Sequence, residues 1–185
     1  MMIISLTGKP CSGKGTLAKV LKEKYNFKVY SVGEIFKEEA KKRGLSSEEF
    51  NKLLLSDPKY DNLLDERTIE LGKKWKNENI VFDSRLAWHF IPHSFKVFLD
   101  LDEDEMAKRL VGSDREGKEK YTDIEEAKRS VIERFNAENV RYKKFYGVDN
   151  TDMSNYDLVL SSKNKTPEEL ADIVYNAYKK HFKIK

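Results

Sequence analysis

The sequence has one cysteine, three histidines and no long apolar segment, and each scarcity excludes a class of protein. Cys11 is the only cysteine, which excludes an internal disulfide, a zinc site built from cysteines and dithiol redox chemistry. His89, His93 and His181 are too scattered along the sequence to indicate a metal site. No apolar run approaches the roughly 20 residues of a membrane-spanning helix, so we expect no membrane partner.

The chain also lacks any block of charge of one sign. Lys and Arg number 35 and Asp and Glu 32, a formal net charge of +3 with both signs well mixed. Because this is unlike a basic nucleic-acid-binding tail, we expect no nucleic-acid partner. Hydrophobic residues at 39% and charged residues at 36% indicate a single globular domain in 185 residues. No basic region precedes the first apolar residues, so we expect no signal peptide and a cytoplasmic protein.

The strongest motif is a glycine-rich segment between an apolar run at 3–6 and a helical pattern. It comprises Gly8, Lys9, Pro10, Cys11, Ser12, Gly13, Lys14, Gly15 and Thr16. The backbone N–H groups of such a loop point at an anion, the helix N-terminus adds its positive dipole end, and the lysine reaches the outer phosphates. This context predicts an ATP-binding loop, the alternative being a chance match in a lysine-rich chain.

The loop departs from the commonest form. Gly15 follows Lys14, and the hydroxyl that usually contacts Mg²⁺ comes one place later, at Thr16. Cys11 stands where a lysine and a helix N-terminus favour a reactive thiolate, but we interpret it as a small residue tolerated in the turn. The Gly-Lys-Gly-Thr form resembles that of nucleoside monophosphate kinases, notably adenylate kinases.

Apolar periodicity predicts a parallel sheet with helices on both faces, an α/β fold. The expected strands are 3–6, 28–31, 80–83, 95–101 and 157–160. Capping boxes mark helix starts at Ser46 with Glu49, at Thr122 with Glu125, and at Thr166 with Pro167 and Glu169. Asp57-Pro58 is expected to open a further helix, and the three-to-four spacing of Leu170, Ile173, Val174 and Ala177 predicts core positions.

Three further stretches make the resemblance specific. They are Ser31-Val32-Gly33-Glu34-Ile35-Phe36-Lys37 with its continuation to 67, then 138–149, then 156–160. They are similar to archaeal-type cytidylate kinases over nearly the whole chain. The resemblance implies a three-layer P-loop kinase fold in one domain, with acceptor-binding helices at about 33–78 and a lid at about 112–140.

The resemblance also implies the acceptor site. It assigns acceptor binding to Ser31, Gly33, Lys37, Arg43, Asp61 and Arg67, with Asp61 reading the base. Lys37 stands where an arginine is expected, which keeps the charge but loses the planar bidentate fork. For any one of these charges a solvated helix face is the alternative.

Asp83 and Arg85 end an apolar strand. Because the carboxyl ends of strands border the ligand crevice of an open α/β sheet, we expect Asp83 to hold Mg²⁺ through water and Arg85 to bind the acceptor phosphate. A salt bridge between the two is the alternative. Relatives commonly have glycine where this chain has Ser84, which puts the close backbone approach in doubt.

On the donor side the resemblance places Arg109 on the base and Arg115, Arg134 and Arg141 on the transferring phosphates. Arg134, Glu138 and Arg141 share one helical stripe, with the arginines roughly 10 Å apart. Surface ion pairing is the competing interpretation. The loop 163–165 either borders the adenine or is solvated.

The resulting hypothesis is a monomeric cytidylate kinase that converts MgATP and CMP to ADP and CDP, with dCMP as a further acceptor. Mg²⁺ is the expected cofactor, with Thr16 and Asp83 as its candidate ligands. Another monophosphate kinase, acting on AMP or UMP, is the first alternative. A nucleotide-dependent binding switch without kinase activity is the second, although it would not need so many arginines.

Overall fold

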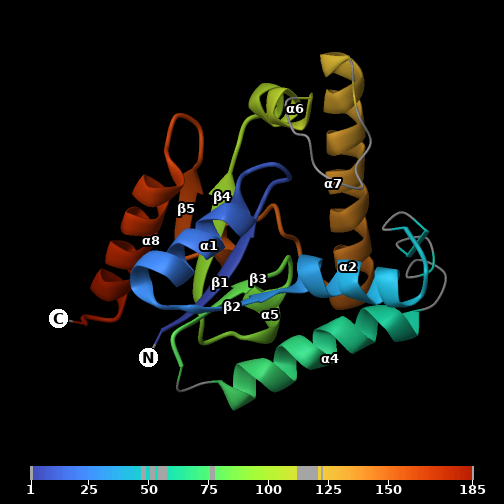
Figure 1. The fold of residues 1–185 in the computed structure, drawn as a ribbon. Coiled ribbons are helices and arrows are strands. Elements are labelled where there is room, and N and C mark those ends of the chain that lie inside the picture. The colour runs from blue at the N-terminus through green and yellow to red at the C-terminus, as the bar shows by residue number, and fades with distance from the viewer. Residues whose placement is uncertain are drawn as a thin grey trace.

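A parallel sheet in the order β2-β3-β1-β4-β5 forms the centre of the molecule (Figure 1). The computed structural model describes residues 2–46, 49–50, 53, 58–75, 78–111, 121 and 123–184, with only the backbone for 58–64. In this part of the chain the strands are β1 (Ile3–Gly8), β2 (Lys28–Ser31), β3 (Ile80–Asp83), β4 (Phe95–Asp100) and β5 (Leu158–Ser161). Every neighbouring pair is parallel, as the sequence predicts.

Helices cover both faces of the sheet. They are α1 (Lys14–Tyr25), α2 (Val32–Lys42), α4 (Pro58–Lys74), α5 (Ala87–Phe90), α6 (Glu103–Val111), α7 (Ile124–Tyr146) and α8 (Pro167–His181), with a 3-10 turn η1 (Met153–Asn155). Helices α1 and α8 pack together on one face, whereas α4 and α5 contribute to a second cluster on the other. These layers confirm the three-layer α/β fold.

The alternation of β1 explains why both faces are covered. Ile4 and Leu6 belong to the cluster that contains Leu17 of α1 and Val174 of α8, whereas Ile3 packs in the opposite cluster with α4 and α5. Successive strand residues point to opposite faces, so a strand that is buried at every position needs a helical layer on each side.

Two of the three capping boxes predicted from the sequence are present in the structure. Ser46 and Glu49 exchange reciprocal bonds of 2.7 and 3.1 Å, and Thr166 and Glu169 form the predicted box at α8. The box at Thr122 is wrong: the N-cap of α7 is Asp123, whose carboxylate accepts from the Glu125 N–H at 3.1 Å. A carboxylate caps as well as a hydroxyl, so the residue adjoining the first helical position takes the role. Thr122 and Asp57 lie outside the described residues, although Pro58 does begin α4.

One predicted core residue is also wrong. Ile173 of α8 is 36% exposed, whereas Leu170 and Val174 are buried. Three apolar positions in five residues span a wider arc of the helix than its contact with α1 and the sheet covers.

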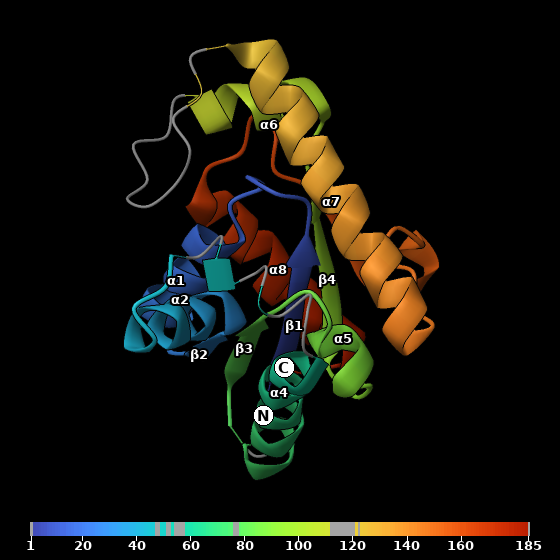
Figure 2. The ribbon, with the colours of Figure 1, turned by 90° about the vertical axis from the view of Figure 1, so that its right-hand side faces the viewer.

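Helices α6 and α7 pack against each other, and α6 follows the carboxyl end of β4 directly. Figure 2 shows α7 running from α6 at the top of the molecule down toward α5. The Phe90 and Tyr146 rings, 5.6 Å apart, join the lower end of α7 to α5. This path takes α7 past the end of the sheet at which β1 and β3 finish.

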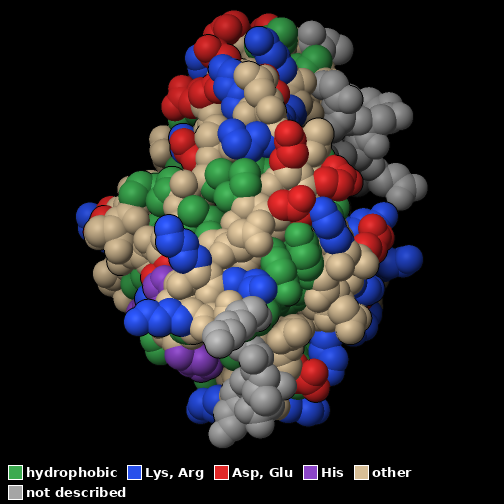
Figure 3. All heavy atoms as spheres, turned by 90° about the vertical axis from the view of Figure 1, so that its left-hand side faces the viewer, with side chains coloured by type: hydrophobic (Ala, Val, Ile, Leu, Met, Phe, Trp, Pro, Cys, Tyr) green, Lys and Arg blue, Asp and Glu red, His purple; other side chains and the backbone are tan. Residues whose placement is uncertain are grey.

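The surface carries both signs of charge. On the face drawn in Figure 3, acidic and basic side chains are intermingled. Among the described residues, no helix has the length and apolar character needed to cross a membrane.

Candidate nucleotide site

The glycine-rich loop is anchored to β4 by a close backbone contact. Gly8 has φ +152°, and a Cβ at this position would lie 2.3 Å from the Leu99 carbonyl oxygen, so only glycine fits. The Lys9 N–H donates to that oxygen at 3.1 Å, and the Lys9 ammonium lies 2.8 Å from the Asp100 carboxylate. Both the side chain and the N–H of Lys9 thus tie the loop to β4.

The turn itself exposes backbone donors. Cys11 (φ 57°) and Gly13 (φ +91°) take left-handed conformations, and Ser12 closes the turn by donating its hydroxyl to the Lys9 carbonyl at 2.8 Å. Helix α1 starts at Lys14 with Gly13 as N-cap and no side-chain cap bond. The first N–H groups of α1 are therefore open to an anion, which a helix N-terminus attracts.

Two cations converge on one carbonyl oxygen. The Lys14 ammonium donates to Gly8 O at 3.2 Å and to Lys9 O at 3.3 Å, and Arg85 donates through Nη1 to the same Gly8 oxygen. Burial and the neighbouring Arg85 charge lower the pKa of Lys14 to about 7, although Asp83 and Glu138 act in the opposite direction. The site thus concentrates positive charge at the loop.

Arg85 makes its ion pair with Glu138 of α7, not with Asp83. Arg85 Nε lies 3.1 Å from Glu138 Oε2, and the two side chains are 22% and 26% exposed. Tyr142, one turn further along α7, is buried, and this burial raises its pKa to about 12. The Arg141 guanidinium lies 5.2 Å from the centre of the Tyr142 ring, which brings this predicted arginine to the same region.

Sequence reasoning missed Glu138 and Tyr142 as members of the site. Glu138 was visible between Arg134 and Arg141 on one helical stripe, but there it supported the interpretation as surface ion pairs. Tyr142 gave no signal beyond being one of nine tyrosines.

Asp83 and Ser31 lie at the mouth of the loop. The Ser31 hydroxyl donates to Asp83 Oδ2 at 3.4 Å, and a Cβ on Gly15 would lie 3.8 Å from the same carboxylate oxygen. The carboxyl end of β3 thus places Asp83 beside the first turn of α1, as expected for a strand end at the ligand crevice.

A pocket of about 450 Å³ adjoins the loop on its other side. Its lining comprises Cys11, Ser12, Gly13, Thr16, Arg109, Ser162, Lys165, Pro167 and Leu170. Arg109 spans the pocket, donating to the Ser162 carbonyl at 3.2 Å and to the Cys11 carbonyl at 3.5 Å. Of the loop 163–165, Lys165 lines the pocket, whereas Lys163 pairs with Asp102 at 2.9 Å.

The remaining predicted residues lie apart from this group. On α2, Gly33 and Lys37 are exposed and Arg43 pairs with Glu39; on α4, Arg67 pairs with Glu70 at 2.7 Å. Arg134 is exposed on α7. Arg115 and the Asp61 side chain lie outside the described residues.

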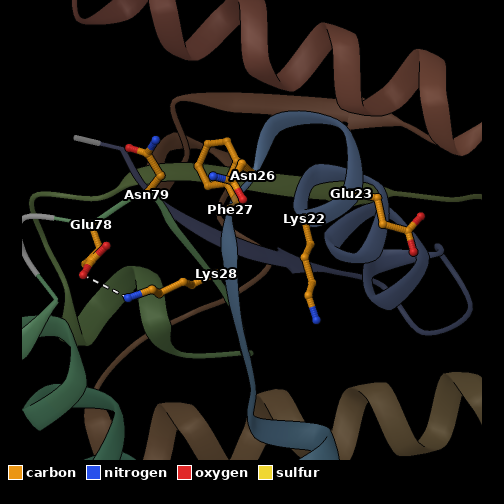
Figure 4. A pocket seen from close by; sticks show the side chains of 7 residues that line it. All are labelled: Lys22, Glu23, Asn26, Phe27, Lys28, Glu78 and Asn79. Carbon is orange, nitrogen blue, oxygen red and sulfur yellow. Dashed lines mark ion pairs between the residues drawn. The ribbon is translucent and has the colours of Figure 1, made fainter.

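A second hollow, of about 460 Å³, lies at the amino ends of β2 and β3 (Figure 4). Its lining mixes both charge signs and includes the ion pair of Lys28 and Glu78 at 2.9 Å. Ligands of open α/β sheets bind at the carboxyl ends of the strands, so this hollow does not belong to the nucleotide site.

The fold and the loop together define a P-loop kinase. A solved shikimate kinase from Aquifex aeolicus has the same fold, with a TM-score of 0.60 at 22% identity over 98% of both chains. The profile of the cytidylate kinase-like family matches residues 3–164, and the chain belongs to this family.

Two relatives show how far the likeness extends. A protein named cytidylate kinase from Methanocella arvoryzae is 36% identical over 176 residues, which are 95% of this chain and 96% of the relative. A protein from Lacinutrix mariniflava named S-adenosylmethionine-dependent nucleotide dehydratase is 34% identical over 96% of this chain but only 36% of its own length. The second name describes a much longer protein.

Proposed function

We propose that this kinase transfers the γ-phosphoryl group of ATP to CMP, giving ADP and CDP, and that it also accepts dCMP. The observation that carries the proposal is the convergence of Lys14 and Arg85 on the Gly8 carbonyl. Joining a triphosphate to a phosphate acceptor requires cations from the donor and acceptor sides at one point. The relatives that are named cytidylate kinases support cytidine as the acceptor base.

In this proposal the loop holds the donor. Its backbone N–H groups and the α1 N-terminus bind the phosphates, and Lys14 contacts the β- and γ-phosphates. The donor base enters the 450 Å³ pocket, where Arg109 packs on its face. Because donor pocket and acceptor arginine come from one chain, we propose a monomeric enzyme.

The residues at the mouth of the loop fit Mg²⁺. This ion keeps several waters and takes few protein ligands beside substrate phosphates, and the half-buried Asp83 carboxylate next to α1 supplies such a ligand. We propose that Asp83 holds the ion through water and that the exposed Thr16 hydroxyl faces the phosphates. Bound there, Mg²⁺ neutralises charge on the β- and γ-phosphates.

The acceptor needs no general base, because its attacking phosphate oxygen is already ionised at neutral pH. Arg85 positions this phosphate, and Arg141 with Arg115 and Arg134 neutralises the charge that develops in a loose transition state. In this proposal the acceptor side comprises the end of β2 and residues on or next to α2 and α4: Ser31, Gly33, Lys37, Arg43, Asp61 and Arg67. Closure of a lid at about 112–140 excludes water and suppresses ATP hydrolysis.

The test is an acceptor panel. The enzyme is mixed with MgATP and with CMP, dCMP, UMP or AMP, and ADP formation is followed against a reaction without acceptor. We expect CMP to give the highest kcat/KM, at least about tenfold above AMP, since the two bases differ in hydrogen-bonding groups. A higher value for AMP would contradict the substrate, and ADP formation independent of any acceptor would contradict the kinase assignment.

A further inference from the structure

Glu138 lies among the cations of the site, yet the proposed transfer gives it no part. It belongs to α7, whereas Arg85 follows β3 and the Gly8 carbonyl ends β1, so the contact joins three elements that are distant in the sequence. With the Arg85 and Glu138 side chains 22% and 26% exposed, this pair is less screened than a surface ion pair.

The contact with Glu138 holds a planar cation by charge. Glu138 Oε2 lies 3.1 Å from Arg85 Nε in an ion pair without a hydrogen bond, while Nη1 of the same guanidinium donates to Gly8 O. The carboxylate therefore keeps the guanidinium beside the loop. Nη1, one of the terminal nitrogens that bind phosphate best, faces the loop.

We infer that Glu138 is a positioning residue for the acceptor phosphate: its ion pair keeps the Arg85 guanidinium at the loop, where a terminal nitrogen meets that phosphate. The inference rests on the proposed function, because it takes Arg85 as the acceptor-phosphate ligand. Helix α7 also carries Arg141 and packs on α6, so one helix sets the place of both arginines. If the Glu138 carboxylate instead competes with the acceptor phosphate for Arg85, removing its charge should lower KM for CMP.

The first test is Glu138→Gln, which keeps the shape of the side chain and removes its charge. We expect KM for CMP to rise about tenfold, the effect of one lost charge-assisted contact, while the Kd of ATP at pH 6 stays within about twofold. The matched control is Glu23→Gln, an exposed glutamate of α1 outside the site and the lid, which should leave both values unchanged. An unchanged KM for CMP would overturn the inference, and a lowered KM would show competition instead.

The second test is a double-mutant cycle. If Glu138 acts through Arg85, adding Glu138→Gln to Arg85→Ala should change KM for CMP by less than about twofold beyond the single Arg85→Ala variant. Additive effects in the cycle would overturn the inference, because Glu138 would then act independently of Arg85.

Separate controls distinguish a variant that does not fold from a failure of the proposed function. Should Glu138→Gln lose its thermal transition, Glu138→Asp replaces it: this variant keeps the charge but is one methylene shorter, and we expect an intermediate rise in KM for CMP. A wild-type KM in that variant would overturn the inference. A wild-type enzyme that phosphorylates none of the monophosphates shows that the proposed function has failed, whereas wild-type turnover of CMP with a normal Glu138→Gln variant shows that this inference alone has failed.

Discussion

The cations at the loop and the cations on the acceptor helices are held in different ways. Arg85 contacts Gly8 from 77 residues away, and Arg109 contacts Cys11 from 98 residues away. Arg43 and Arg67, by contrast, pair with Glu39 and Glu70, four and three residues away on their own helices. The first group is fixed by the tertiary structure and Arg67 by helical spacing, while Arg43 also lies 5.4 Å from the centre of the Phe50 ring.

The difference indicates where the site is preformed. The pair of Arg67 and Glu70 is exposed and contributes only a few tenths of a kcal/mol, so Arg67 can exchange its partner for a ligand at little cost. The Arg43 pair, 32% and 21% exposed, is about as enclosed as the Arg85 pair. Moving Arg85 would leave the partly buried Glu138 carboxylate without its partner. In the proposed function the loop side is therefore preformed for phosphate, whereas Arg67 supplies charge that a ligand has still to organise.

The largest effect is expected at the centre of the preformed side. Lys14→Ala should lower kcat by about 10²- to 10³-fold, since it removes a preorganised cation from the transferring phosphate. The unfolding temperature should not fall, because a desolvated charge is lost as well. Lys19→Ala, an exposed lysine on the same helix, is the control for steady-state rate and thermal unfolding. Wild-type turnover in Lys14→Ala would refute the loop assignment.

Arg85→Ala should act on the acceptor more than on the donor. We expect kcat/KM for CMP to fall about 100-fold, with the Kd of ATP at pH 6 changed by less than about threefold. Arg85→Lys should recover only part of the loss, because an ammonium lacks the planar fork. If Arg85→Ala lost affinity for ATP but kept its kcat/KM for CMP, Arg85 would be assigned to the donor and not to the acceptor.

The crowding of Lys14 and Arg85 predicts a pH dependence of ATP binding. Burial and Arg85 lower the pKa of Lys14 to about 7 in the free enzyme, and bound phosphates favour the charged form and raise it again. Affinity should therefore be constant below about pH 6 and fall as pH rises, about fivefold between pH 7 and pH 8. Calorimetry in buffers of different ionisation enthalpy should show that ATP binding takes up protons. In Lys14→Arg the affinity for ATP should not change with pH. Wild-type affinity that is level from pH 6 to 9 would contradict the lowered pKa.

The smallest effects are expected on the acceptor helices. Arg67→Ala should change the free energy of unfolding by less than about 0.5 kcal/mol, because its pair with Glu70 is exposed. KM for CMP should still rise, about threefold, if Arg67 turns to the acceptor. Arg129→Ala, an exposed arginine of α7, is the control for both measurements. Should Arg67→Ala destabilise the protein by several kcal/mol, the contrast between the two regions would not hold.

Local patterns in the sequence were enough to predict the strands, the loop and most helix starts. The ranges 28–31 and 80–83 coincide with β2 and β3, because short apolar runs between turn residues define both ends of a buried strand. At α7 the capping-box spacing predicts Thr122, whereas the structure uses Asp123, a residue type that caps equally well and adjoins the first helical position.

Partner choice in the site could not be predicted in the same way. The order of charges offered Asp83 as a partner for Arg85 only as the alternative to ligand binding, and the fold supplies Glu138 from a helix more than 50 residues later. Likewise Lys9 is part of the loop motif, but its ammonium is occupied by Asp100 of β4. Such pairs depend on which elements the topology brings side by side, and spacing along the chain does not contain that information.

The Gly8 carbonyl, which accepts from both Lys14 and Arg85, is a natural spectroscopic reporter. A carbonyl carbon shifts its resonance when a charged donor leaves its oxygen, and the chain has only nine glycines to label with ¹³C. In the proposed function, donor phosphates draw the Lys14 ammonium from this oxygen, and the acceptor phosphate changes the charge around Arg85, which stays in place, so the two arrivals give separate displacements of one signal. A single isotope-labelled atom would thus report the order in which the two substrates bind.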